Sequence, residues 1–111
     1  ASDNMRRATR DQHPKNRIVV GLCTIELQLH SSLSLKDKRQ VLQSLIARLR
    51  NEFNVSVAEV DHQDSWQLAT IAVSAVSNDE AYLHSLLEHV AHKLEGARPD
   101  VVLLDYAIEF I

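Results

Sequence analysis

The chain has 111 residues, of which 45% are hydrophobic and 24% are charged. This length fits one domain, and this balance is typical of a folded protein rather than a disordered one. No apolar run approaches the roughly 20 residues of a membrane-spanning helix, and the polar N-terminus lacks the apolar segment of a signal peptide. The single cysteine, Cys23, excludes an internal disulfide and fits a reducing compartment. We therefore expect a cytoplasmic protein with no membrane segment.

Charge is divided unevenly along the chain. Residues 1–50 hold ten of the 12 Lys and Arg residues and four acids, whereas residues 51–111 hold two basic residues and 11 acids. The first part therefore carries a net charge of about +6 and the second about −9. This asymmetry indicates one basic surface and one acidic surface, although such divisions also arise by chance in soluble proteins.

Residues 1–17 are predicted to form a flexible basic tail, because they lack apolar periodicity and are rich in polar residues. We interpret Met5 as the natural start and Ala1–Asn4 as a remnant ahead of it. The basic residues of the tail are Arg6, Arg7, Arg10, Lys15 and Arg17. Such a tail either helps to hold an anionic partner or is simply solvated.

The folded part is predicted to begin at Ile18 with a strand and a helix. Apolar side chains occupy the odd positions of residues 19–29, which is the pattern of a half-buried strand. Ser34 followed by Asp37 resembles a capping box, so a helix should start near Leu35 and close at Asn54. Its apolar stripe consists of Leu42, Leu45, Ile46, Leu49 and Phe53.

A hairpin, a second helix and a last strand should follow. Residues 55–60 and 66–76 have high β propensity and flank the polar turn 61–65, which predicts a hairpin. Ser77 as N-cap, with Glu80 three residues later, predicts a helix that ends at Gly96. The buried side of this helix should hold Leu83, Leu86, Leu87, Val90 and Leu94. Alternation over residues 101–110 predicts the last strand.

The order β-α-β-β-α-β predicts the α+β class and a single ferredoxin-like domain over residues 18–111. In this sandwich the four-stranded antiparallel sheet has the strand order 4-1-3-2, and both helices cover one face. The other, open sheet face is predicted to carry Leu22, Thr24, Glu26, Trp66, Leu68, Thr70, Val101, Leu103, Asp105 and Glu109. The acidic residues of this face would repel phosphate, and its apolar residues favour a protein contact. We therefore expect it to be covered by another protein, or by a second copy of the chain in a homodimer.

Four blocks of the sequence, in chain order, are similar to the YlxP-like family, or domain of unknown function 503. The blocks are residues 34–39 (SLKDKR), 53–60 (FNVSVAEV), 62–67 (HQDSWQ) and 76–79 (VSND), and the resemblance spans about residues 18–111. It implies a ferredoxin-like fold in a small cytoplasmic bacterial protein. Genes of this family often lie among translation and ribosome-maturation genes, which implies RNA or ribosome association. The resemblance implies no catalytic residues, and the tail departs from the compact family pattern.

Three basic residues at the start of the first helix form the first candidate site: Lys36, Lys38 and Arg39. The helix N-terminus is the positive end of the macrodipole, so cations there are unfavourable unless something compensates them. Free N–H groups at a helix start also bind phosphate, so these residues predict a contact with RNA. The alternative is that they are solvated side chains, with Asp37 offsetting part of the charge.

The predicted hairpin turn is the second candidate. His62, Gln63 and Asp64 in the turn, with Trp66 and Leu68 beyond it, are predicted to bind a partner. Asp and His in this turn also suit acid–base chemistry or a metal, but turns commonly recruit them for bonds to the backbone. We therefore assign no catalytic residue.

Other chemistry-bearing residues give weaker signals. His84, Glu88 and His92 recur at intervals of four on the second helix, where a solvated face is a better interpretation than a metal site. Cys23 shares the core side of the first strand, so a buried thiol is expected rather than a nucleophile. Because no phosphate-binding loop, dinucleotide motif or zinc spacing is present, we predict no cofactor and no metal.

Three functional hypotheses stay open at this point. The first is a non-enzymatic RNA- or ribosome-associated accessory factor that uses the first helix. The second is a protein–protein interaction or dimerisation module that uses the open sheet face. The third is a small-molecule-binding domain or minor enzyme centred on His62 and Asp64. We favour them in this order.

Overall fold

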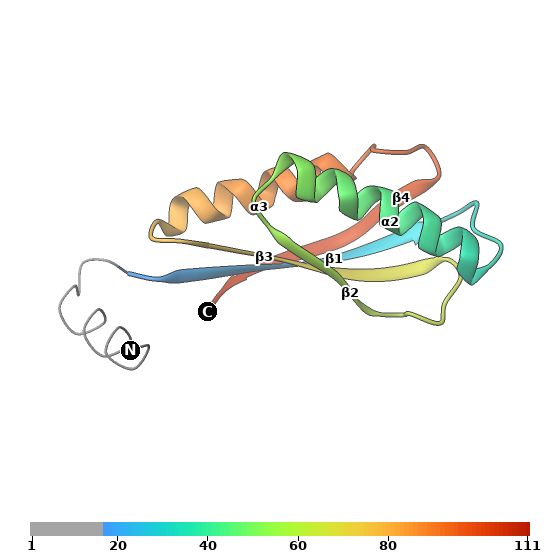
Figure 1. The fold of residues 1–111 in the computed structure, drawn as a ribbon, viewed down its shortest axis with the longest axis horizontal. Helices are drawn as coiled ribbons and strands as arrows, with labels where there is room; N and C mark the ends of the chain where they lie inside the picture. Colours follow the sequence, from blue (N-terminus) through green and yellow to red (C-terminus); the bar gives the residue numbers. More distant parts are fainter. Residues whose placement is uncertain (1–16) are drawn as a thin grey trace, which may run out of the picture.

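The computed structural model describes residues 17–111, so the expectations for residues 1–16 lie outside it. Its elements, in chain order, are β1 (Val19–Leu29), α2 (Leu35–Glu52), β2 (Ser56–Asp61), β3 (Leu68–Ser77), α3 (Glu80–Leu94) and β4 (Val101–Phe110) (Figure 1). This order confirms the predicted α+β class and the ferredoxin-like layout.

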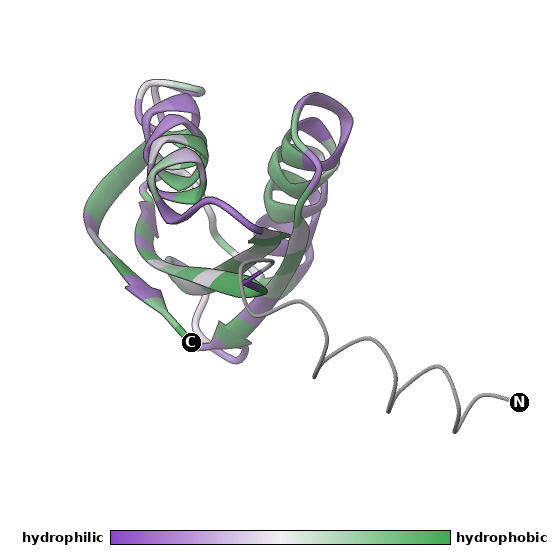
Figure 2. Ribbon diagram, turned by 90° about the vertical axis from the view of Figure 1, so that its left-hand side faces the viewer, coloured by the Kyte–Doolittle hydropathy of each residue, from purple (hydrophilic) through white to green (hydrophobic). Residues whose placement is uncertain are grey.

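The strands form one antiparallel sheet in the order β2-β3-β1-β4, which is the predicted order. Cys23 of β1 lies opposite Val73 of β3 and Ile108 of β4, which fixes the register of the three longest strands. Figure 2 shows both helices on the same side of the sheet, so the opposite side is left open. The edges of the sheet are β2 and β4.

The core lies between this sheet and the two helices. Its largest cluster consists of Cys23, Ile25, Leu27, Leu29, Leu42, Leu45, Leu49, Val57, Ala69, Ile71, Val73, Leu87, Val90, Leu94 and Val101. The odd residues of β1 are buried, as the alternation of the sequence predicted. Gly21 lies so close to α3 that a Cβ there would meet Leu87 Cδ1 at 2.8 Å. A side chain at this position would therefore force the tip of the Leu87 side chain to move.

The helix ends agree with the sequence in one case and differ in the other. Ser34 caps α2 as predicted, because its side chain accepts a hydrogen bond from the Asp37 N–H at 3.0 Å. The N-cap of α3 is Asp79 and not Ser77, since the Asp79 carboxylate accepts from the Tyr82 N–H. Ser77 lies two residues before this N-cap, and its hydroxyl accepts from the Asp79 N–H.

Two of the residues expected on the open sheet face lie on the core side instead. A β-bulge in β4 places Leu103 opposite Leu27 and Asp105 opposite Glu26, so the alternation of the strand changes phase between them. Val101 and Leu103 therefore pack toward the helices, and Val102 and Leu104 are the exposed residues. Strict alternation along the sequence does not reveal such an inserted residue.

Candidate functional site

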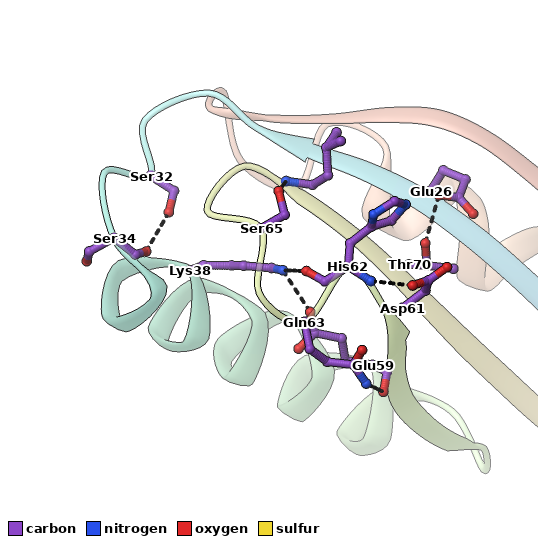
Figure 3. A network of polar contacts seen from close by, with 11 residues as sticks. Glu26, Ser32, Ser34, Lys38, Glu59, Asp61, His62, Gln63, Ser65 and Thr70 are labelled. Atoms are coloured by element: carbon purple, nitrogen blue, oxygen red, sulfur yellow. Dashed lines mark hydrogen bonds and ion pairs between the residues drawn. The ribbon is translucent and has the colours of Figure 1, made fainter.

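The structure brings the two predicted sites together at one end of the molecule. The side chain of Lys38, from the first turn of α2, donates a hydrogen bond to the backbone carbonyl of His62 at the end of β2 (Figure 3). Its Nζ also lies 2.9 Å from Oε2 of Glu59 on β2. The helix start and the β2–β3 turn (residues 62–67) are therefore one surface, which we name the hairpin end.

Lys38 is a buried residue, with 1% of its surface exposed. It occupies a core position of α2, because it precedes Leu42, Leu45 and Leu49 at intervals of four, seven and 11 residues. Burying an ammonium group is costly unless an opposite charge and hydrogen-bond acceptors surround it. Glu59 and the His62 carbonyl supply both. A phosphate contact by Lys38 would require the side chain to leave these partners.

His62 adopts a left-handed backbone conformation, with φ of 61°. This region is unfavourable for most residues, although His tolerates it better than β-branched residues do. The conformation turns the chain at the end of β2, where the His62 N–H donates to Oδ1 of Asp61 and the carbonyl accepts from the Ser65 N–H and from Lys38. These contacts fix the direction in which the turn leaves the sheet.

Gln67 ties the other side of the turn to the start of α2. Its carbonyl accepts from the Leu29 N–H at 2.7 Å. Its side-chain amide donates to the carbonyls of His30 and Ser32. His62 and Gln67 thus anchor the two ends of the turn. The side chains between them are consequently held at the surface beside α2.

The predicted site residues other than Lys38 are open to solvent, in whole or in part. Lys36, Arg39, Gln63 and Asp64 are exposed, and His62 is half-buried. Trp66 has 55% of its surface exposed and Leu68 has 36%. The hairpin end therefore combines two exposed cations with an exposed indole. The role predicted for Lys36 and Arg39 is compatible with this placement.

The outward side of α2 extends this basic surface. The exposed residues at helical spacing are Lys36, Gln40, Gln43, Ala47 and Arg50, with Arg39 beside the first of them. This stripe runs for about 21 Å along the helix and contains no carboxylate. Asp37 lies to its side, where Oδ2 accepts from the Leu33 N–H as part of the helix cap. At its first turn the stripe thus offers hydrogen-bond donors and positive charge, from Lys36 and Arg39, whereas Arg50 at its far end donates to the Val57 carbonyl of β2.

The open sheet face has the opposite character. Its carboxylates are Glu26 on β1, Asp61 on β2, and Asp105 and Glu109 on β4. Within residues 17–111, the strands place no Lys or Arg on this face. Exposed apolar residues stand among the carboxylates, including Leu68, Val76, Val102 and Leu104. A phosphate backbone would be repelled from such a surface.

A separate cluster of polar side chains connects α3 with β4. The Tyr106 hydroxyl donates to Glu88, and the Nε2 atoms of His84 and His92 lie 3.6 and 4.0 Å from the two oxygens of this carboxylate. The hydrogen bond to Glu88 raises the pKa of Tyr106.

Cys23 of β1 lies in the core near this cluster. Burial and the charge of Glu88 raise the pKa of the Cys23 thiol to about 11. Cys23 is fully buried, so the structure holds it as an unreactive thiol.

Two cavities lie away from the predicted turn chemistry. One of about 230 Å³ is lined by Leu29, Ser31, Ser32, Asp37, Gln40, Val41, Arg98 and Asp100. There Arg98 donates to both carboxylate oxygens of Asp100 and lowers its pKa. Another of about 330 Å³ is lined by Asn54, Val55, Ser56, Ser74, Ala75 and Val76. Neither cavity is lined by His62 or Asp64, on which the small-molecule hypothesis rests.

Among residues 17–111, no group of three or more His, Cys, Asp or Glu side chains is arranged to hold a metal ion. None of the helices in the same range is long and apolar enough to cross a membrane.

The sequence interpretation missed Glu59 and Gln67, which hold the hairpin end in place. A signal for Glu59 was present. Lys38 occupies a core position of the first helix, which predicts an acid nearby to neutralise its buried charge. Glu59 is such an acid, because it follows Val57 on the core side of β2. Gln67 acts through loop carbonyls that come from 35 and 37 residues earlier in the chain. No local pattern predicts contacts of that kind.

The fold and this site define a small ferredoxin-like α+β protein with a stripe of cations on α2 and an acidic open sheet face. The family model described as "Protein of unknown function (DUF503)" matches residues 20–108, and the chain belongs to this family. The chain is also 35% identical over 72 residues to the "Uncharacterized protein YlxP" of Bacillus subtilis (strain 168), which covers 65% of this chain and 78% of that relative. The designed protein Foldit4 resembles it in fold, with a TM-score of 0.50 and 14% identity over 86% of this chain and 97% of that one.

The ion pair of Lys38 can be tested by a double-mutant cycle. Lys38→Met should destabilise the protein by roughly 2 kcal/mol, less than the 3–5 kcal/mol of a fully buried pair, because Glu59 keeps 21% of its side-chain surface exposed. The double variant Lys38→Met/Glu59→Leu should recover most of this loss, since no charge is then left without its partner. Urea unfolding of the four proteins measures the coupling, and strictly additive losses would contradict the pair.

The left-handed conformation of His62 gives a second stability prediction. His62→Val should destabilise the protein by about 1–2 kcal/mol, because a β-branched residue tolerates this backbone region poorly. His62→Gly should be close to neutral, since glycine accepts the conformation freely. Asp64→Val, at an exposed position of the same turn with ordinary φ, is the control and should change the midpoint of thermal unfolding little. If the two valine variants lowered the midpoint of thermal unfolding equally, backbone strain at His62 would not be the cause of the loss.

Proposed function

We propose that the protein is a cytoplasmic, non-enzymatic accessory factor that contacts RNA or the ribosome with its hairpin end. The observation that supports this most is the outward stripe of α2, which carries the exposed cations Lys36 and Arg39 and no carboxylate. Arg50, at the far end of the stripe, instead donates to the Val57 carbonyl of β2 at 2.8 Å. Phosphate oxygens accept hydrogen bonds from exposed Lys and Arg side chains, and positive charge supplies most of the non-specific affinity for nucleic acid.

Trp66 adds a second element to the same surface. Its indole is more than half exposed, and it belongs to the turn that Lys38 ties to the start of α2. An exposed aromatic ring near Arg or Lys side chains suits an unpaired base, which can stack on the ring. The acidic open sheet face would direct a polyanion away from the rest of the molecule and toward α2.

The role of Lys38 in this proposal is to position the site. Its ammonium group is held by Glu59 and the His62 carbonyl, so removing it would disturb the turn as well as the charge. Variants intended to test phosphate contact therefore leave Lys38 in place. Lys36 and Arg39 can be changed without breaking any hydrogen bond or ion pair that the structure describes for them.

The test is co-sedimentation with ribosomal subunits, followed by a salt titration on an isolated ribosomal RNA fragment. Lys36→Ala/Arg39→Ala should weaken binding and lower the salt slope by about two, because two phosphates are then no longer neutralised. Arg48→Ala/Lys93→Ala removes the same charge away from the stripe and should leave the slope unchanged. Wild-type protein that stays in the supernatant at every salt concentration would refute the proposal.

A protein–protein interaction module is the second candidate, because the open sheet face has a composition unlike that of α2. Val102 and Leu104 are 38% and 52% exposed, and they continue the apolar surface of Leu68 across the sheet. Exposed apolar residues gathered on one side of a sheet favour a protein contact. A second copy of the chain, forming a homodimer, is the partner that the sequence suggested.

Sedimentation equilibrium of the full chain tests the homodimer. If copies associate through the open sheet face, Leu68→Glu should raise the dimer dissociation constant by tenfold or more, which corresponds to about 1.4 kcal/mol. Leu33→Glu is the control, because it makes the same change at a leucine that is 72% exposed, against 36% for Leu68, and lies in the loop before α2. A monomer at all concentrations would exclude the homodimer.

A further inference from the structure

The sheet has two edge strands, and side chains occupy the outer side of one of them, β2. Arg50 of α2 donates to the Val57 carbonyl at 2.8 Å, and the Gln63 amide donates to the Glu59 carbonyl at 3.5 Å. Val57 and Glu59 are two residues apart, so their backbone groups point the same way, away from β3. The β2 edge is also short and interrupted by a bulge. It is therefore protected against pairing with a strand of another chain.

The outer side of β4 has no such cover within residues 17–111. The Ile111 N–H donates to the Val20 carbonyl of β1 at 2.9 Å. In an antiparallel ladder, backbone groups point toward the neighbouring strand at every second residue and away from it at the residues between. The N–H and C=O groups of Ile108 and Phe110 therefore point away from β1. In the described part of the chain, no side chain or loop is hydrogen-bonded to them.

The bulge of β4 limits the free edge to the second half of the strand. The register with β1 shifts between Leu103 and Asp105, which would interrupt pairing along the first half. Beyond the bulge, residues 106–110 pair with β1 in one unbroken register. They include no Lys and no Pro, the residues that commonly protect an exposed edge. We name residues 106–110 the β4 edge.

The side chains of the β4 edge alternate between two kinds. Tyr106, Ile108 and Phe110 point to the helix side, where they pack against the core but stay only half-buried. Ala107 and Glu109 point to the open sheet face and are exposed. A strand placed beside β4 would therefore cover apolar surface on the helix side and also pair the free backbone groups.

Two copies of the β4 edge can pair antiparallel about a two-fold axis, and charge distinguishes the possible centres. With Ala107 on the axis, Asp105 of each copy lies opposite Glu109 of the other. With Glu109 on the axis, the two Glu109 carboxylates meet. Like charges directly opposite each other are destabilising, so both arrangements are unfavourable.

The arrangement with Ile108 on the axis avoids this repulsion. Glu109 then lies opposite Ala107 of the other copy, and Tyr106 lies opposite Phe110. Aromatic residues directly opposite each other stabilise a strand pair. The outward backbone groups of both copies also meet in this register. The Tyr106 N–H, which Oδ1 of Asp105 accepts at 2.9 Å, would exchange this acceptor for a carbonyl of the second copy.

We infer that the β4 edge is a dimerisation site, at which residues 106–110 of two copies pair antiparallel about Ile108 and join the two sheets into one. The occupant is a second copy because the segment is complementary to itself in this register, as a two-fold contact requires. The site lies at the rim of the sheet and leaves the open sheet face uncovered. It therefore depends neither on the proposed RNA contact nor on a protein contact at that face.

Sedimentation equilibrium of charge variants tests the site and its register. Ala107→Glu places a carboxylate opposite Glu109 of the other copy, twice in each dimer, and should raise the dimer dissociation constant by about tenfold. Ala107→Glu/Glu109→Lys puts opposite charges at the same two places and should restore most of the affinity. Ala58→Glu is the matched control, because Ala58 is an exposed alanine on β2, the other edge strand. It should leave the dissociation constant unchanged.

Amide hydrogen exchange gives a readout that a loss of folding stability does not imitate. The N–H groups of Ile108 and Phe110 should exchange about tenfold more slowly at concentrations where the dimer prevails than in dilute monomer. The N–H groups of Ala107 and Glu109 point to β1 and should be protected at both concentrations. Unchanged midpoints of thermal unfolding would show that the variants are folded.

A monomer at every concentration would overturn the inference. A dimer that Ala58→Glu weakens as much as Ala107→Glu does would also overturn it, and would place the contact on the open sheet face, as the second candidate function proposes. A loss of affinity that Ala107→Glu/Glu109→Lys does not reverse would overturn the register about Ile108. Recovery in this double variant, together with slow exchange of the Ile108 N–H, supports the β4 edge as the dimer contact.

Discussion

The contact of Lys38 with Glu59 and the His62 carbonyl is the constraint on which the hairpin end depends. An ammonium group with 1% exposure needs an acid and an acceptor within hydrogen-bond distance, and both come from one strand end. This requirement fixes how α2 sits over β2 and which way the turn leaves the sheet. Because Lys36 and Arg39 flank Lys38 on the same helix, their place at the same end as Trp66 follows from it.

The helix side of the molecule and its open side are electrostatically different for a related reason. On the helix side, the carboxylate of Glu59 neutralises the buried Lys38, and the outward stripe of α2 has no acid among its residues. On the open side, the carboxylates have hydrogen-bond donors and no described cation. Basic residues of the first half thus gather on the outward stripe of α2, whereas the acids of the second half are divided between the open sheet face and α3, which carries Glu80 and Glu88.

Most of the fold could be predicted from local patterns. The odd-position apolar residues of β1, the capping box at Ser34 and the β-α-β-β-α-β order each have one physical solution in a small sandwich. What the sequence could not show was set by contacts distant in the chain. The inserted residues of β2 and β4, and the contacts of Gln67 with the loop before α2, leave no periodic trace. The position of Lys38 was the one readable sign of the site, and it predicts burial rather than a phosphate contact.

The bulge in β2 links the two surfaces. Residues 59 and 61 are two apart, so a regular strand would place both acids on one face. The inserted residue instead directs Glu59 to Lys38 on the helix side and Asp61 to Thr70 on the open side. His62, immediately after it, turns the chain toward α2. A change that straightened β2 would therefore remove the partner of Lys38 or take the Asp61 carboxylate off the open sheet face. The hairpin end and the open sheet face are for this reason coupled through residues 59–62.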